Sequence, residues 1–97
     1  MAYQSKDLSV LAYANGFTSW HYRTSDDAGE VLKPGYFNGA SDLIRWGDMV
    51  MVNCIDGGFC GGGILIVTTS NLGSVTTQAV SPFVSKPVAT PVSSVAA

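Results

Sequence analysis

The feature that most constrains the fold is a pair of hydrophobic runs, DMVMVNCI (48–55) and GILIVTTS (63–70), with the glycine-rich stretch DGGFCGGG (56–63) between them. Both runs are short and rich in β-branched residues, which predicts two strands that are apolar on both faces at their centres. Glycine adopts positive φ without a steric penalty, so a short glycine-containing loop between two such runs is typical of a β-hairpin.

Other segments extend this pattern. SNLGS (70–74) predicts a turn into a third strand, SVTTQAV (74–80), and the alternation in FTSWHYRT (17–24) predicts another. SKDLSVLAYANG (5–16) predicts a short helix, because a capping residue precedes it and Asn15-Gly16 supplies a left-handed stop.

The middle of the chain is expected to be less regular. Residues 24–35 predict a solvated loop with a short strand at Val31-Leu32. Residues 38–48 predict one or two helical turns that end at Gly47 and present Leu43, Ile44 and Trp46 to the core.

These elements predict a mainly β fold, namely a small antiparallel β-sheet or barrel-like domain with one or two short helices and an extended C-terminal arm. The domain covers residues 1–80 and includes the short N-terminal helix. The arm covers residues 81–97, which contain three prolines, one charge and no periodicity.

Composition limits the classes of partner. Charged residues make up 12% of the chain, against about 25% in a typical globular protein, while 46% of the residues are hydrophobic. Low surface charge and a small core both favour self-association. The net charge of −2 and the scattered basic residues argue against nucleic-acid binding. No apolar run approaches the length of a membrane span or a signal peptide, so we expect synthesis in the cytoplasm and no membrane partner.

The glycine stretch does not match the motifs that bind phosphate. No register places glycines at the three positions of a dinucleotide loop, and Gly63-Ile64 stands where a P-loop requires Lys and a hydroxyl residue. Two cysteines with five residues between them and one distant histidine do not form a zinc motif. We therefore expect no cofactor and no metal.

The cysteines leave alternatives open. Cys54 and Cys60 face each other near the predicted hairpin turn, so they form either a disulfide or two reduced, buried thiols. Cys60 with His21 and an Asp could also form the nucleophilic set of a small thiol enzyme. We expect a protein without enzymatic activity, because any chain of this length offers some such combination.

Three segments carry a family resemblance: AYQSKDLSVLAYANGFTSWHYRT, GYFNGASDLIRWGDMVMVN and GILIVTTSNLGSVTT. They resemble small virion structural proteins of tailed bacteriophages, the capsid decoration, cement and head-spike proteins, over roughly residues 2–80. Trp46 and the paired cysteines depart from the family pattern. The resemblance implies a non-enzymatic subunit on the capsid surface of the virion, assembled in the bacterial host cytoplasm. Its implied partners are further copies of itself, as a homotrimer, and the phage major capsid protein.

Interfaces favour aromatic anchors, although each tryptophan is alternatively a core residue. The candidates are Trp20, Tyr22, Tyr36, Phe37, Trp46 and Phe83. Phe83 is expected to anchor on a neighbour, because the arm around it offers no local core. The alternative function is a glycan- or receptor-binding module of a head or tail fibre, in which Trp20, Tyr22 or Trp46 would stack on sugars.

Overall fold

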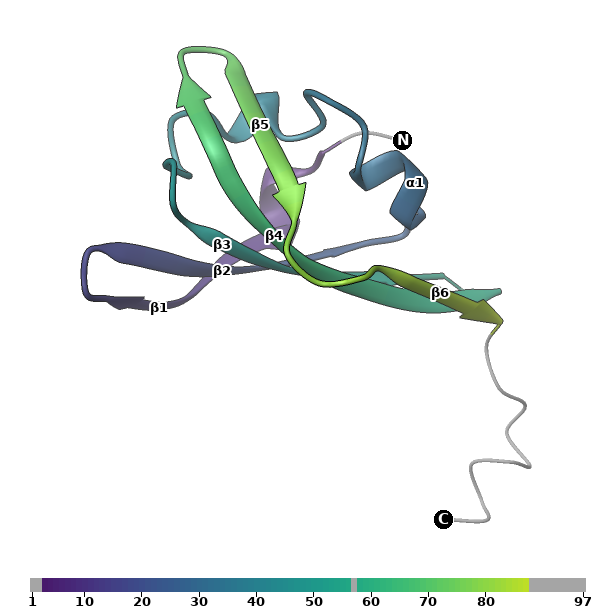
Figure 1. The fold of residues 1–97 in the computed structure, drawn as a ribbon. Helices are drawn as coiled ribbons and strands as arrows, with labels where there is room; N and C mark the ends of the chain where they lie inside the picture. The colour runs from purple at the N-terminus through teal and green to yellow at the C-terminus, as the bar shows by residue number, and fades with distance from the viewer. Residues whose placement is uncertain (1–2, 57, 88–97) are drawn as a thin grey trace.

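A computed structural model describes residues 3–56 and 58–87, which form one β-sheet with short helical segments on one side (Figure 1). The strands are β1 (Leu8–Ala14), β2 (Phe17–Thr24), β3 (Met49–Ile55), β4 (Phe59–Asn71), β5 (Ser74–Ala79) and β6 (Val84–Pro87). The helical segments are η1 (Ser5–Asp7), α1 (Ala28–Val31) and η2 (Asn38–Ala40). The predicted mainly β fold class is confirmed, as are the strands that correspond to β2, β3, β4 and β5.

The sheet is mixed rather than wholly antiparallel. Its order is β1-β2-β3-β4-β5. The β6 strand also pairs with β4, at residues 59–62, whereas β5 pairs with residues 65–71 of β4. The β2–β3 pair is parallel and the other pairs are antiparallel. Parallel neighbours need a long crossover connection. Here residues 25–48, with α1 and η2, cross one face of the sheet to provide it (Figure 1).

The predicted N-terminal helix is wrong beyond its first turn. Only Ser5–Asp7 are helical, as a 3-10 turn, and residues 8–14 form the edge strand β1. Asn15 (φ 54°) and Gly16 (φ 88°) join β1 to β2. Two consecutive residues with positive φ form the type I′ turn that connects antiparallel strands, so this pair turns a hairpin rather than ending a helix.

The crossover connection also differs from prediction. Val31 ends α1 rather than forming a strand, and Asp27 caps this helix by accepting a hydrogen bond from the Glu30 N–H at 2.9 Å. Ile44 is buried as predicted. Leu43 and Trp46 are exposed, so their predicted place in the core is wrong.

The two faces of the sheet have different surroundings. The inner face packs against the crossover connection, and its buried side chains are Trp20, Tyr22, Val50, Val52, Cys54, Leu65, Val67 and Val75. The opposite face, called the open face here, is not covered by any described helix or loop (Figure 1). Met49, Met51, Ile55, Ile64 and Ile66 lie at its centre.

Most of the glycine-rich stretch lies within β4 rather than in the turn. Gly62 has φ +150°, and a β-carbon there would collide with the Val52 carbonyl oxygen of β3. A β-carbon on Gly63 would collide with the Phe83 ring. Glycine is therefore required where β4 approaches its neighbours most closely.

Candidate functional site

A buried carboxylate organises one end of the sheet. Asp48 accepts hydrogen bonds at 3.0 Å from the backbone N–H groups of Thr18 and Arg45 and from the Trp20 indole N–H. The turn before it includes Gly47 (φ 88°), whose N–H donates to the Val67 carbonyl at 2.7 Å. Asp48 thus joins the start of β2 to the 45–48 turn.

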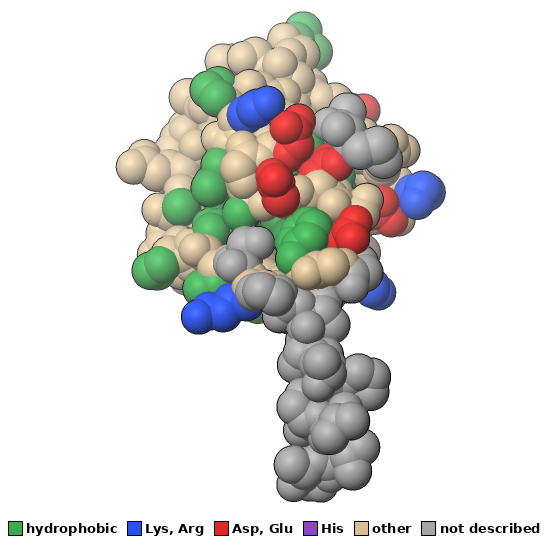
Figure 2. All heavy atoms as spheres, turned by 90° about the vertical axis from the view of Figure 1, so that its right-hand side faces the viewer, with side chains coloured by type: hydrophobic (Ala, Val, Ile, Leu, Met, Phe, Trp, Pro, Cys, Tyr) green, Lys and Arg blue, Asp and Glu red, His purple; other side chains and the backbone are tan. Residues whose placement is uncertain are grey.

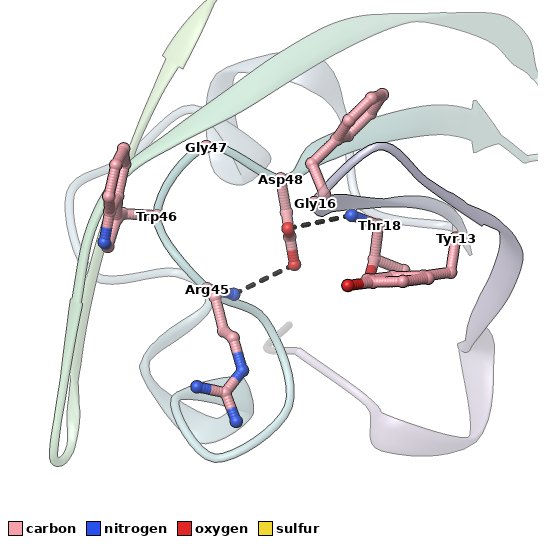
Figure 3. Close-up of a pocket in the computed structure, with 8 residues that line it drawn as sticks. Tyr13, Gly16, Thr18, Arg45, Trp46, Gly47 and Asp48 are labelled. Atoms are coloured by element: carbon pink, nitrogen blue, oxygen red, sulfur yellow. Dashed lines mark hydrogen bonds between the residues drawn. The ribbon is translucent and has the colours of Figure 1, made fainter.

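A pocket of about 420 Å³ lies over this carboxylate, between the β1–β2 hairpin and the 45–48 turn (Figure 3). Trp46 and Tyr13 are 77% and 72% exposed, and Phe17 is 38% exposed. The lining residues are Tyr13, Gly16, Phe17, Thr18, Arg45, Trp46, Gly47 and Asp48. Figure 3 shows the Trp46 and Tyr13 rings on opposite sides of Asp48. The pocket therefore offers exposed aromatic surface above a polar floor.

The polar groups of this pocket are largely engaged within the chain. Its lining contains neither a cysteine nor a histidine. The Asp48 carboxylate is already bonded to three N–H groups. Arg45 reaches it through its backbone N–H, and its guanidinium points away in Figure 3. What remains for a ligand is aromatic surface with hydrogen-bond donors at the rim.

The open face is the second candidate surface. In the register of the sheet, Met49 lies opposite Ile66 and Met51 opposite Ile64. Beside them, His21 Nε2 and Asn53 Oδ1 form a hydrogen bond of 2.6 Å between β2 and β3. In an antiparallel sheet with one solvated face, the outward residues are normally polar. The outward residues of β3 and β4 are instead mostly Met and Ile.

A tyrosine cluster fills the other end of the inner face. Tyr36 donates a hydrogen bond to Asp26 at 2.7 Å and shares one of 2.9 Å with Tyr22. Tyr3 stacks on Tyr22, with ring centroids 5.6 Å apart. Burial raises the pKa of Tyr36 strongly, and hydrogen bonds with Tyr22 and Asp26 raise it further. Burial likewise raises the pKa of Tyr3. This cluster stabilises the crossover connection and is closed to a ligand.

The two cysteines are free and do not pair in this structure. The register sets Cys54 opposite Gly61 and Cys60 opposite Ile55, so the two side chains point to opposite faces of the sheet. The disulfide hypothesis is therefore corrected. Cys54 is buried and Cys60 is exposed, so only one of the two is the buried thiol of the alternative hypothesis. Burial raises the pKa of Cys54, and the nearby Asp27 and Asp26 raise it further.

The hypothetical thiol-enzyme set is not assembled. His21 lies opposite Met51 and bonds to Asn53, whereas Cys60 lies opposite Ile55. Met51 and Ile55 are four residues apart on β3, which is about 13 Å along a strand. Within residues 3–56 and 58–87, no three His, Cys, Asp or Glu side chains are arranged to hold a metal ion.

The predicted interface residues divide into three groups. Trp20, Tyr22 and Phe37 are buried in the core, so they cannot anchor a neighbour or stack on a sugar. Tyr36 is half-buried in the tyrosine cluster. Trp46 is exposed beside the pocket.

Phe83 has a different environment from the one expected. Its ring packs over Gly63 and against the core, so its own chain provides the contact that was assigned to a neighbour. Residues 84–87 of the predicted arm pair with β4 as β6. Residues 88–97 lie outside the described residues.

Tyr13, Phe17 and the Met and Ile side chains of the open face were not among the candidates predicted from the sequence. The Asn15-Gly16 pair was the available signal, because a hairpin there places Tyr13 opposite Thr18. In a strand over residues 48–55, successive side chains alternate between faces, which assigns Met49 and Met51 to the face opposite Val50 and Val52.

Figure 2 looks at the end of the sheet where α1 lies and shows acidic side chains gathered there. Asp26 and Asp27 follow β2, and Asp56 follows β3, so the parallel pairing brings these segments to the same end.

No helix in the described part of the chain is both long enough and apolar enough to cross a membrane.

Comparisons with known proteins give no family for this chain: no family model, no curated protein and no solved structure matches it.

Proposed function

We propose that this chain is a non-enzymatic structural subunit of a tailed-phage particle, a capsid decoration or cement protein that assembles as a homotrimer on the virion surface. The observation that carries the proposal is the open face of the sheet. Its central side chains are Met49, Met51 and Ile55 of β3 and Ile64 and Ile66 of β4, and Asn53 is the one polar residue among the outward positions of β3.

An apolar sheet face that no described element covers is a poor surface to leave in water; Met51 is 45% exposed, and Met49, Ile55, Ile64 and Ile66 are partly exposed. Extended apolar patches mark interaction sites in soluble proteins. The low charge of the chain points the same way, because few charged groups must be desolvated when this face is buried. A small domain also gains stability from subunit contacts that enlarge its core.

The partners in this proposal are those that the resemblance to phage virion proteins implies. In this proposal the open face contacts further copies of the chain and the assembled shell of the major capsid protein. Such a subunit needs no active site.

Co-sedimentation with assembled shells tests the proposal. The purified chain is mixed with assembled shells of a phage major capsid protein and, separately, with the unassembled shell protein. We expect binding to shells and much weaker binding to unassembled subunits. Met51 is 45% exposed, so Met51→Lys leaves the folded chain intact while placing a charge on the open face. It should weaken shell binding by at least about tenfold, because burying an unpaired charge is costly.

Leu32→Lys is the matched control, because Leu32 is 41% exposed and follows α1 on the covered side of the sheet. It should bind shells like the parent chain. A chain that ignores shells, or equal binding by all three proteins, would refute the proposal.

A further inference from the structure

We propose that the pocket between Tyr13, Phe17 and Trp46 binds the segment around Pro91, within residues 88–97, of a neighbouring copy of this chain. This inference concerns a different surface from the open face, and it does not depend on shell binding.

The pocket has the chemistry that recognises proline-rich chains. Proline-rich segments adopt the polyproline II conformation, which exposes backbone carbonyls, and they dock in grooves lined by aromatic rings. Trp46 and Tyr13 present such rings, and both are more than two-thirds exposed. Neither the Trp46 indole N–H nor the Tyr13 hydroxyl makes a hydrogen bond within the described part of the chain, so both are available as donors to carbonyls.

The chain contains a matching segment. Pro91 lies within this segment, and Pro87, the last residue of β6, directly precedes it. Residues 88–97 read VATPVSSVAA and contain no charged side chain. An uncharged, proline-containing segment suits a pocket whose single carboxylate is already satisfied by three N–H groups.

The register of the sheet decides which copy supplies the segment. Pro87 pairs with Phe59 at the start of β4, whereas the pocket residues Gly47 and Asp48 are hydrogen-bonded to Val67. Phe59 and Val67 are eight residues apart, which is about 26 Å along a strand. The four residues from Pro87 to Pro91 span at most about 14 Å. Pro91 therefore cannot reach the pocket of its own chain, so a contact made through Pro91 comes from another copy.

The two ends of the molecule give this contact a direction. In Figure 1 the β1–β2 turn and the end of β6 lie at opposite ends of the sheet. A contact between unlike surfaces is heterologous, and such contacts generate closed rings when the rotation between subunits closes. The proposed exchange of segments is thus compatible with a cyclic trimer.

Binding of a labelled peptide tests the inference. A fluorescent peptide with the sequence of residues 84–97 is added to the full chain, and its anisotropy is followed. We expect saturable binding. Trp46→Ala should weaken it by at least about tenfold, which is the loss typical of an interface tryptophan. A peptide with alanine at both Pro87 and Pro91 should also bind more weakly.

Leu72→Ala is the control, because Leu72 is an exposed apolar residue of the β4–β5 turn, away from the pocket. It should bind the peptide like the parent chain, and circular dichroism should show that Trp46→Ala is folded. Equal binding by Trp46→Ala, or no binding at millimolar protein, would overturn the inference. A third result would also overturn the inference. If glycans change the tryptophan fluorescence of the parent chain but not of Trp46→Ala, and the peptide changes neither, the pocket binds sugar instead of the peptide. If the chain binds the peptide but not shells, only the proposed function is refuted. If it binds shells but not the peptide, only this inference is refuted.

Discussion

At the scale of single residues, Asp48 joins segments that are distant in the sequence. Its carboxylate accepts three hydrogen bonds while almost fully buried. Asp48→Asn replaces one acceptor oxygen with an NH₂ group that faces N–H donors. We expect a loss of about 2–4 kcal/mol in the free energy of unfolding, since buried groups that lose a charged partner are expensive. Urea unfolding measures it.

Asp42→Asn is the control for this change, because Asp42 is exposed. It should alter stability by less than about 0.5 kcal/mol. If Asp48→Asn were equally mild, the carboxylate would not organise this end of the sheet.

The two thiols should react at very different rates. Cys54 is buried and its pKa is raised, so the thiolate that reacts with alkylating reagents is scarce at neutral pH. Cys60 is exposed. Iodoacetamide at pH 7.5 should label only Cys60 in the folded chain, as mass spectrometry of peptides would show. Cys60→Ser should then take up no label until denaturant is added, and rapid labelling of Cys54 would contradict its burial.

At the scale of elements, the glycines of β4 permit close strand pairing. Gly62→Ala places a β-carbon against the Val52 carbonyl at a φ of +150°, which L-residues rarely adopt. We expect the free energy of unfolding to fall by at least about 3 kcal/mol, or the chain not to fold, because moving the β3 backbone would break its pairing with β4. Thermal unfolding followed by circular dichroism measures it.

Gly58→Ala provides the comparison, because the nearest atom to a β-carbon there is an Asp56 carboxylate oxygen at 4.0 Å. This variant should unfold within a few degrees of the parent chain. A Gly62→Ala variant as stable as Gly58→Ala would mean that β3 and β4 do not pair in this register.

Hydrophobic pattern predicted the strands but not every element. The β3, β4 and β5 strands follow from short segments rich in Val, Ile, Thr and other apolar residues between turn signals, which favour the extended conformation. Residues 8–14 were ambiguous, because Leu8, Leu11 and Ala12 also fit one face of a helix. The outcome depended on pairing with β2, a long-range contact that local propensity does not contain.

At the scale of the whole molecule, the tyrosine cluster should make stability depend on alkaline pH. Tyr3 and Tyr36 have pKa values raised above the ordinary value of 10.0. Their contribution is therefore fully present below pH 10 and is lost as the pH rises above it, because the unfolded chain releases these protons first. The melting temperature should fall steeply above pH 10.

Tyr36→Phe removes the hydroxyl that bonds Asp26 and Tyr22. It should cost about 1 kcal/mol at pH 7 and flatten the alkaline decline. Tyr13→Phe, which changes an exposed residue, should leave the stability at pH 7 and the alkaline decline unchanged. An identical alkaline decline in Tyr36→Phe and the parent chain would contradict the burial of this hydroxyl.

The candidate surfaces were harder to predict than the fold. The sequence singled out Trp46, but it did not separate this exposed tryptophan from the buried Trp20, because both stand among mixed polar and apolar neighbours. The open face needed the sheet topology, since only the path of the crossover connection decides which face remains bare. Phe83 lacked a sequence signal because its partner, Gly63, has no side chain.

The most direct test of the assembly proposal is the absolute mass of the full chain by light scattering over a range of concentrations, compared with Met51→Lys. We predict a mass near three times that of one chain, which falls toward one chain in Met51→Lys and is unchanged in Leu32→Lys. A single-chain mass at every concentration for all three proteins would contradict the assignment of the open face as a surface that buries itself by assembly.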